Sequence, residues 1–209
     1  MANLLRIDSS SRIEDSHSRK LADYFQASWL RRYPDTEVLV RDTIKTPAPH
    51  LSDITIAGFY TLPEQQTEEM KQALVLSDQL ISELQSADVL LLSVPMYNFS
   101  IPSALKAWID QVVRINQTFA YDGTNFTGLV TVKKAFIICT YGAAGYTDGG
   151  PFSSFNFLEP YLKGLLGFLG IPEIHFFNLQ ATTGDPSVVA TNTQQIQQAI
   201  DIDAAISAS

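Results

Sequence analysis

Four consecutive residues, Met96 to Phe99, carry the clearest chemical signal in this chain. They follow an apolar run that ends at Pro95, and they precede Pro102 and Ser103, which suit the start of a helix. The apolar run, residues 89–94, lacks polar alternation, as a parallel strand buried on both faces does. Open α/β sheets bind ligands at the carboxyl ends of such strands. We therefore predict that Met96, Tyr97, Asn98 and Phe99 hold a planar ring system, rather than serving as ordinary core residues.

A second stretch, residues 8–18, offers chemistry for an anion. It contains five serines, Arg12 and His17, and it leads into a predicted helix whose first N–H groups are free. Ser10, Ser16 and Ser18 are suited to donate to phosphate oxygens. The alternative is that Ser16 or Ser18 only caps the helix. The chain has neither a G-x-x-x-x-G-K-[ST] nor a G-x-G-x-x-G sequence, so neither a P-loop nor a Rossmann dinucleotide site is indicated, and a terminal monophosphate fits better.

A third stretch, residues 140–151, is rich in glycine and permits close backbone approach to a ligand. Taken alone, it is equally compatible with a flexible connection. Together, a monophosphate site, a planar surface and a glycine-rich wall describe a site for flavin mononucleotide, FMN. The histidines show no spacing typical of metal ligands, so we predict no metal site.

These stretches must be positioned by regular elements, and the sequence shows strands and helices in alternation. A hairpin is expected at 118–128 with Asp122-Gly123 as its turn, and residues 43–62 show no clear period and are expected to form a long connection. The predicted fold is α/β, a flavodoxin-like doubly wound five-stranded parallel sheet with helices on both faces. The predicted strands are 3–7, 36–40, 89–94, 135–140 and 175–179, and the predicted helices are 18–31, 64–85, 103–113, 157–169 and 186–206.

Composition sets the broad class. The 209 residues include 45% hydrophobic ones, which suits one α/β domain. With the site predicted above, we expect a single flavodoxin-like FMN-binding domain over residues 1–209. The formal net charge is -8 and no basic stripe occurs, so nucleic acid is not an expected partner. No apolar segment resembles a signal peptide or a membrane span, and the single Cys139 lies in an apolar run. We expect no membrane association and a cytoplasmic location.

The chain resembles the FMN-dependent NADH-azoreductases, also described as NADH:quinone oxidoreductases, of the flavodoxin-like superfamily. The resemblance covers essentially the whole chain. Its most specific part is Pro95-Met-Tyr-Asn-Phe99, followed by Ile101, Leu105, Lys106 and Asp110. Further matching segments are Asp78 to Leu84, Thr118-Phe119, Tyr121, Gly128 to Val130, Lys133 to Ala135, Pro160 to Leu162 and Gly167 to Ile171.

The resemblance implies roles for individual residues. Ser10 and the Ser16-His17-Ser18 turn would hold the phosphate and ribityl end of one FMN per subunit. Met96 to Phe99 would line the isoalloxazine, and Thr140, Tyr141, Gly142 and Ala143 would complete its polar edge. The family works as a homodimer with each active site at the interface, where Tyr121 and Phe168 would shape the acceptor pocket. Packing within the hairpin is the competing role for Tyr121.

The implied activity is transfer of hydride from NADH, or NADPH, through FMN to quinones and azo compounds. One shared pocket implies ping-pong kinetics, and cleaving an azo bond to two amines takes two cycles. The cofactor carries the chemistry, so we assign no catalytic side chain. Two alternatives remain open: a flavodoxin-type electron carrier, and a binding or scaffold protein without flavin.

The chain departs from the family pattern in three segments, which are residues 8–18, residues 140–155 and the long connection at 43–62. His17 stands where the family commonly has glutamine, and Thr140 to Ala143 replace a frequent Ser-Arg-Gly-Gly. Residues 149–155 look like a small insertion. An arginine that some members carry in the long connection is replaced around Phe59 and Tyr60. These changes bear on acceptor and nicotinamide preference more than on flavin binding.

Overall fold

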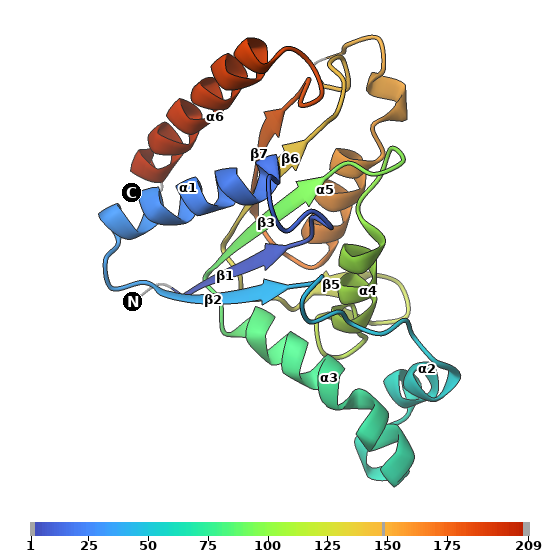
Figure 1. Cartoon of the computed structure of the whole chain (residues 1–209). Coiled ribbons are helices and arrows are strands. Elements are labelled where there is room, and N and C mark those ends of the chain that lie inside the picture. The colour runs from blue at the N-terminus through green and yellow to red at the C-terminus, as the bar shows by residue number, and fades with distance from the viewer. Residues whose placement is uncertain (1–2, 148, 207–209) are drawn as a thin grey trace.

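The computed structural model describes residues 3–147 and 149–206, and it contains a five-stranded parallel sheet. The strand order is β2-β1-β3-β6-β7, which confirms the flavodoxin-like arrangement (Figure 1). Because β1 lies between β2 and β3, the chain reverses its direction of winding there, and the crevice at the carboxyl ends of β1 and β3 is open to a ligand. The strands are β1 (Asn3–Asp8), β2 (Glu37–Asp42), β3 (Val89–Pro95), β6 (Lys134–Thr140) and β7 (Glu173–Leu179).

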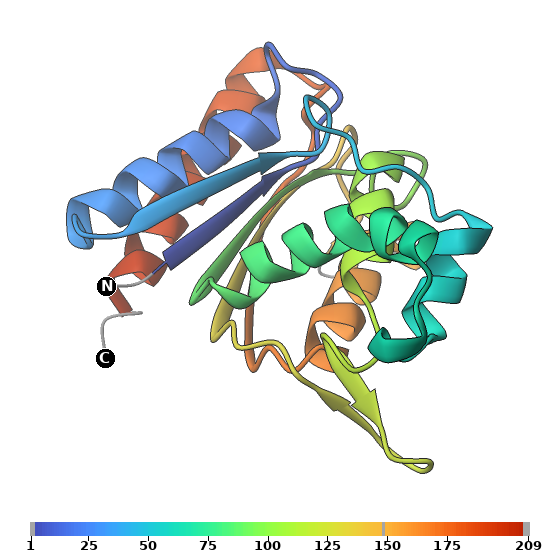
Figure 2. The same ribbon diagram turned by 90° about the horizontal axis from the view of Figure 1, so that it is seen from below.

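Helices cover both faces of the sheet, as predicted (Figures 1 and 2). Two of them, α1 (His17–Arg32) and α6 (Pro186–Ile206), pack on one face over an aromatic core that includes Phe25, Trp29 and Phe136. The opposite face is covered by α3 (Glu68–Gln85), α4 (Ser103–Val112) and α5 (Leu158–Phe168). All seven residues of β3 are buried, which explains its unbroken apolar sequence.

The connection at 43–62 contains regular structure, which the sequence did not predict. It contains the helix α2 (Asp53–Tyr60), whose cap Ser52 accepts a hydrogen bond from the N–H of Thr55. Only Thr55 and Gly58 of α2 are buried, so the helix has too narrow an apolar stripe to show a period. A 3₁₀ turn, η1 (Pro63–Gln65), follows. The next helix, α3, therefore begins at Glu68 rather than at residue 64, with Thr67 as its cap.

The predicted hairpin is present as β4 (Phe119–Tyr121) and β5 (Phe126–Gly128), and it projects from the body of the molecule (Figure 2). Its turn is longer than the predicted Asp122-Gly123 pair. The carboxylate of Asp122 accepts the N–H groups of Thr124 and Asn125, so residues 122–125 form the connection. Asp122 thus organises a four-residue loop. The Asp-Gly sequence alone is compatible both with such a loop and with a two-residue turn.

Gly128 anchors the hairpin to the body. A Cβ at this position would lie 2.2 Å from the backbone carbon of Leu169. Only glycine permits the backbones to approach so closely.

Among the described residues, no helix is long and apolar enough to span a membrane.

Candidate functional site

Three loops meet at the carboxyl edge of the sheet, because they follow the neighbouring strands β1, β3 and β6. The strand register pairs Asp8 with Ser93 and Pro95 with Thr140, so the loops begin side by side. We call them the first loop (residues 9–16), the second loop (96–102) and the third loop (141–157). Hydrogen bonds join them: the hydroxyl of Tyr97 accepts the N–H of Ser11 at 3.2 Å, and the N–H of Met96 donates to the carbonyl of Thr140 at 2.8 Å.

The first loop ends at Ser16, which caps α1 by accepting a hydrogen bond from the N–H of Arg19. Capping therefore occurs, but it uses only one hydroxyl. Ser16 and Ser18 lie 3.2 Å apart through their Oγ atoms, and Ser10, Ser16 and Ser18 are nearly inaccessible to solvent. Within the described part of the chain, the N–H groups of His17 and Ser18 have no acceptor. Such a helix start attracts anions.

His17 gives this helix start a titratable group. Its imidazole lies with Lys20 and Thr182 along a groove of about 720 Å³ between the beginnings of α1 and α6. Burial is the main cause that lowers its pKa, and the positive charges of Lys20 and Arg12 lower it further. The imidazole is consequently neutral at pH 7 in the protein without an anion, and the backbone of the helix start supplies the attraction.

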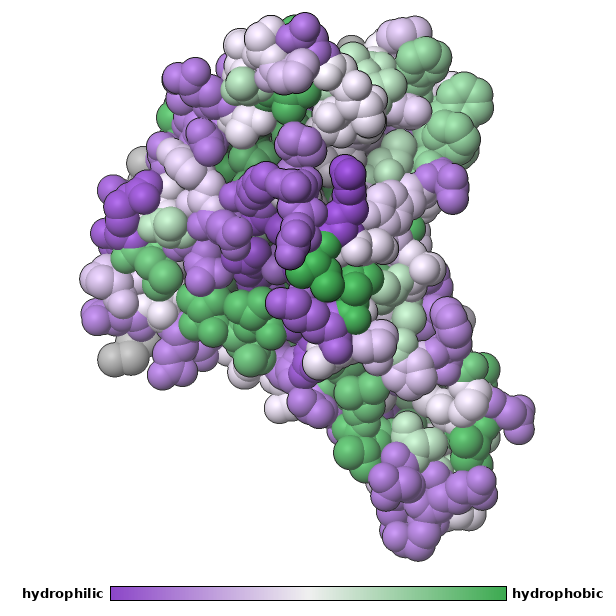
Figure 3. All heavy atoms as spheres, viewed as in Figure 1, coloured by the Kyte–Doolittle hydropathy of each residue, from purple (hydrophilic) through white to green (hydrophobic). Residues whose placement is uncertain are grey.

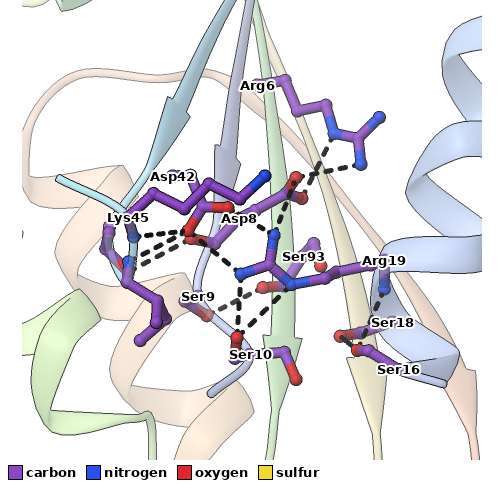
Figure 4. A network of polar contacts seen from close by, with 12 residues as sticks. Arg6, Asp8, Ser9, Ser10, Ser16, Ser18, Arg19, Asp42, Lys45 and Ser93 are labelled. Carbon is purple, nitrogen blue, oxygen red and sulfur yellow. Dashed lines mark hydrogen bonds and ion pairs between the residues drawn. The ribbon is translucent and has the colours of Figure 1, made fainter. Parts of the chain in front are cut away.

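Beside the first loop lies an ion-pair network that sequence reasoning missed (Figure 4). The guanidinium of Arg19 contacts Asp42 at 2.6 Å and Asp8 at 3.5 Å, and Arg6 contacts Asp8 at 2.9 Å. All four residues are buried or half-buried. One signal for the network was available: Arg6 and Asp8 are charged residues within an otherwise apolar strand, and buried charges need partners.

The second loop is held in an uncommon backbone conformation. Tyr97 and Ser100 exchange two backbone hydrogen bonds, and Asn98 and Phe99 between them have φ angles of 49° and 70°. Positive φ is costly for residues other than glycine, and it concentrates at functional sites. The turn exposes Asn98 and Phe99, and Asn98 lines a groove of about 530 Å³ together with His50 and Tyr161.

In the third loop, the structure separates Tyr141 from its neighbours. Its side chain is fully buried, and its hydroxyl donates to Glu159 Oε1 at 2.8 Å, so the ring belongs to the core. Burial raises the pKa of Tyr141 strongly. Its N–H donates to Leu179 and its carbonyl accepts from Thr182, so the backbone is occupied as well. The structure therefore places the side chain of Tyr141 in the core, behind the expected polar edge.

Gly142 and Ala143, unlike Tyr141, are exposed to solvent. Among the described residues, no protein group accepts their N–H groups, whereas the carbonyl of Gly142 is held by Thr183. These two N–H groups are therefore available to donate to a ligand. Thr140 itself is buried at the end of β6.

An aromatic rim continues from the second loop into the third. The ring of Phe99 lies 5.4 Å from that of Phe155 in the 3₁₀ turn η2 (Ser153–Phe155), and the carbonyl of Phe99 accepts the N–H of Phe157. Phe152, Phe155 and Phe157 are about half exposed. Figure 3 shows apolar surface gathered over this segment, at the upper right. The residues that look like an insertion thus build a wall beside Phe99.

The predicted acceptor residues, Tyr121 and Phe168, lie elsewhere. They belong to an aromatic cluster in which Tyr121 stacks on Phe126 at 4.6 Å and Phe168 contacts Phe119 and Phe126. The hairpin leads to the amino end of β6, and α5 leads to that of β7, so this cluster lies at the amino edge of the sheet. Within one chain it cannot join the three loops. No group of metal-binding side chains occurs among the described residues.

The chain is similar to known proteins over most of its length. A family model described as "Flavodoxin-like fold" matches residues 2–202. An FMN-dependent NADH:quinone oxidoreductase of Xanthobacter autotrophicus is 53% identical over 174 residues, which cover 83% of this chain and 84% of that protein. A protein of the same name from Hydrogenovibrio crunogenus is 41% identical over 200 residues, covering 96% of this chain and 98% of that protein.

Solved structures share the architecture. An azoreductase from Bacillus anthracis aligns with a TM-score of 0.88 and 23% identity, over 98% of this chain and 99% of its own. A Bacillus anthracis FMN-dependent NADH-azoreductase in complex with FMN aligns with a TM-score of 0.86 and 23% identity, over 98% of this chain and 100% of its own. At this level of identity, the structural likeness establishes the fold.

Proposed function

The chain belongs to the flavodoxin-like fold family, and on that premise we propose that it is an FMN-dependent NADH:quinone oxidoreductase that also reduces azo compounds. One observation carries the proposal: the free N–H groups at the start of α1, the exposed turn at Asn98 and the free N–H groups of Gly142 and Ala143 converge at one edge of the sheet. The names of the relatives at 53% and 41% identity support it.

The first loop fits the phosphate of FMN. The N–H groups of His17 and Ser18 would bind phosphate oxygens, and the hydroxyls of Ser10, Ser16 and Ser18 would donate further hydrogen bonds. A dianion suits this place because the helix dipole is positive there. His17, whose pKa is lowered by burial in the protein alone, would become a cation beside the phosphate if the phosphate raised that pKa.

The second and third loops fit the ring system. Met96, Tyr97, Asn98 and Phe99 would line the isoalloxazine, and the backbone N–H groups of Gly142 and Ala143, with Thr140, would form its polar edge. Tyr141 would support this edge from the core through its bond to Glu159.

FMN, when bound, supplies hydride transfer between the nicotinamide donor and the quinone or azo acceptor. The protein's own contribution is to orient and to stabilise. The N–H groups of Gly142 and Ala143 would stabilise the negative charge that develops on the ring's polar edge, as donors of an oxyanion hole do. The aromatic rim at Phe99 and Phe155 would exclude water from the exposed face. Because donor and acceptor would use one pocket, we expect ping-pong kinetics.

We propose that the active enzyme is a homodimer. Tyr121 is 48% exposed and Phe126 60% exposed, and their rings stack on each other on a projecting hairpin. Neighbouring exposed aromatic side chains of this kind mark protein–protein contact sites. Since Tyr121 and Phe168 lie at the opposite edge of their own sheet, they would complete the acceptor pocket only in a partner subunit.

The match to residues 2–202 supports one FMN-binding domain, and the buried Cys139, the only cysteine, suits a cytoplasmic enzyme.

The visible spectrum of the purified protein tests the proposal. We expect absorption typical of oxidised flavin, bleaching on anaerobic addition of NADH, and recovery of the colour on addition of a benzoquinone. A protein that binds FMN but does not bleach with NADH or NADPH would instead be an electron carrier. A colourless protein that does not take up added FMN would be a binding protein, and the proposal would be wrong.

A further inference from the structure

Arg19 is buried in the first turn of α1, and its side chain reaches back beneath the first loop (Figure 4). Its Nε and Nη2 donate to the carbonyl of Ser10 at 3.3 and 2.8 Å. Its Nη1 and Nη2 donate to the two carboxylate oxygens of Asp42 at 2.6 and 3.0 Å. Nη1 also lies 3.5 Å from Asp8. The planar fork of the guanidinium is thereby fully used by protein acceptors.

The peptide group between Ser10 and Ser11 is fixed at both ends. Arg19 holds its carbonyl oxygen, and its N–H donates to the hydroxyl of Tyr97 at 3.2 Å. The carbonyl dipole is therefore turned toward the guanidinium and away from any anion at the helix start. The Oγ of Ser10 accepts the N–H of Arg12 at 3.3 Å, which leaves the hydroxyl proton of Ser10 free to donate.

The charge of Arg19 does not itself serve as a counterion for a ligand. Asp42 and Asp8 flank the guanidinium and balance it, with Arg6 on the far side of Asp8. Asp42 is in turn fixed by the N–H groups of Ile44 and Lys45 at the end of β2. The Arg19–Asp42 pair therefore ties α1 and the first loop to the sheet. It fixes the orientation of the first loop and adds no net charge to the site.

We propose that Arg19, held by Asp42, is a positioning residue that directs Ser10 toward the phosphate of FMN, and that it makes the protein prefer FMN over riboflavin. This inference rests on the proposed function, since it concerns the same site. Riboflavin carries the same ring system without the phosphate. A residue that acts through the phosphate loop changes the affinity for FMN and leaves the affinity for riboflavin alone.

The test is titration of the flavin-free full-length protein with FMN and with riboflavin, followed by quenching of flavin fluorescence. In the Arg19→Met variant we expect the FMN affinity to fall about tenfold or more, the loss expected for a hydrogen bond to a charged group. The riboflavin affinity should stay within about twofold, which also shows that the ring site is folded. Asp42→Asn should likewise lower the ratio of the FMN affinity to the riboflavin affinity.

Two further variants separate positioning from other effects. Arg19→Lys keeps the charge but cannot hold Ser10 and Asp42 with one planar fork, so the ratio should remain reduced. Arg114→Met removes another buried arginine, which pairs with Asp78 away from the three loops, so it should cost stability without changing the ratio. Full recovery of the ratio in Arg19→Lys, or an equal fall with Arg114→Met, would overturn the inference.

The inference and the proposed function can fail separately. If the unmodified protein binds neither flavin, the proposed function is wrong. If it binds both flavins with equal affinity and is bleached by NADH, the function stands and the role of Arg19 in phosphate recognition is overturned. If Arg19→Met weakens both flavins equally, Arg19 has a general structural role and the inference is likewise wrong.

Discussion

At the scale of single residues, the second loop shows how the chain stores backbone strain at its proposed ring site. Asn98 and Phe99 both have positive φ, and the two hydrogen bonds between Tyr97 and Ser100 hold them there. Asparagine tolerates this region better than most residues, and phenylalanine does not. The sequence predicted the location of the site from the strand end and the prolines. It could not predict the strain, which depends on the closure of the turn.

Replacing Asn98 separates the backbone role of this residue from its contact with the ring. Asn98→Ala should lower stability by about 1 kcal/mol, because alanine is disfavoured at positive φ, and should also weaken FMN binding. Asn98→Gly should keep the stability and still weaken FMN binding. Urea unfolding of the flavin-free protein and a fluorescence titration measure the two effects. Unchanged FMN affinity in both variants would show that the ring lies elsewhere.

Tyr141 provides a contrasting prediction for a residue behind the site. Tyr141→Phe removes a buried hydroxyl that donates to Glu159, so we expect a loss of about 1–2 kcal/mol in the free energy of unfolding. FMN affinity should be unchanged, because the ring is in the core. Urea unfolding and flavin titration decide between the two roles. A loss of affinity with unchanged stability would restore the sequence-based placement of Tyr141 at the polar edge.

At the scale of elements, the site depends on ties between elements that are far apart in the chain. The end of β2 reaches the start of α1 through Asp42 and Arg19, and the N–H of Thr43 donates to the carbonyl of Asp8. Periodicity predicted α1 and β2 separately to within two residues. The ion pair between Arg19 of α1 and Asp42 of β2 was not predictable, because either charged side chain could equally have been exposed to solvent.

The stability of this junction should depend on pH. Burial acts to raise the pKa of Asp42, but the guanidinium of Arg19 and the N–H groups of Ile44 and Lys45 outweigh it, and the pKa is lowered. A carboxyl with a lowered pKa stabilises the fold above its ordinary value, about 3.9, and the contribution disappears as the pH falls through the pKa of the folded state. The stability difference between the unmodified protein and Asp42→Asn should therefore shrink from pH 7 to about pH 3.

Urea unfolding of both proteins across this range measures the effect. A difference that stays constant down to the acid end would mean that Asp42 is not stabilised as a carboxylate in the folded protein.

The hairpin offers a prediction about close backbone approach. Gly128→Ala would place a methyl group against the backbone at Leu169 and Gly170, and we expect it to displace the hairpin at a cost of about 1–3 kcal/mol. Gly164→Ala is the matched control, since nothing lies within 4 Å of the added Cβ in α5. The control should be neutral or stabilising. Equal urea stability of the two variants would contradict the tight fit.

At the scale of the whole molecule, the order of the sheet was predictable and parts of the site were not. Alternating strands and helices with right-handed crossovers leave few topologies, and this constraint alone placed three loops at one edge. The helix α2 was missed because it packs mainly through Thr55 and Gly58 against α3. The burial of the Tyr141 side chain was not predicted, because the alternation of a strand can continue for one residue past its end.

The proposed dimer makes a prediction at this scale. Tyr121→Ser combined with Phe126→Ser removes two exposed aromatic rings from the hairpin, so the protein should sediment as a monomer. It should still bind FMN, because the three loops lie at the other edge of the sheet, and it should lose quinone reduction. Leu39→Ser with Val40→Ser is the control, since it removes similarly exposed apolar side chains from β2. A dimer that persists in the hairpin variant would place the interface elsewhere.

The fastening of the third loop has a consequence for how such an enzyme diversifies. Gln180 holds Tyr146 and Thr147 at one end, and the carbonyl of Phe99 holds Phe157 at the other. The exposed side chains of Phe152 and Phe155, between these fixed points, can change in type without moving Thr140 or Gly142. Natural variation can therefore reshape the outer wall, and with it the range of compounds reduced, while the cofactor site stays under separate selection.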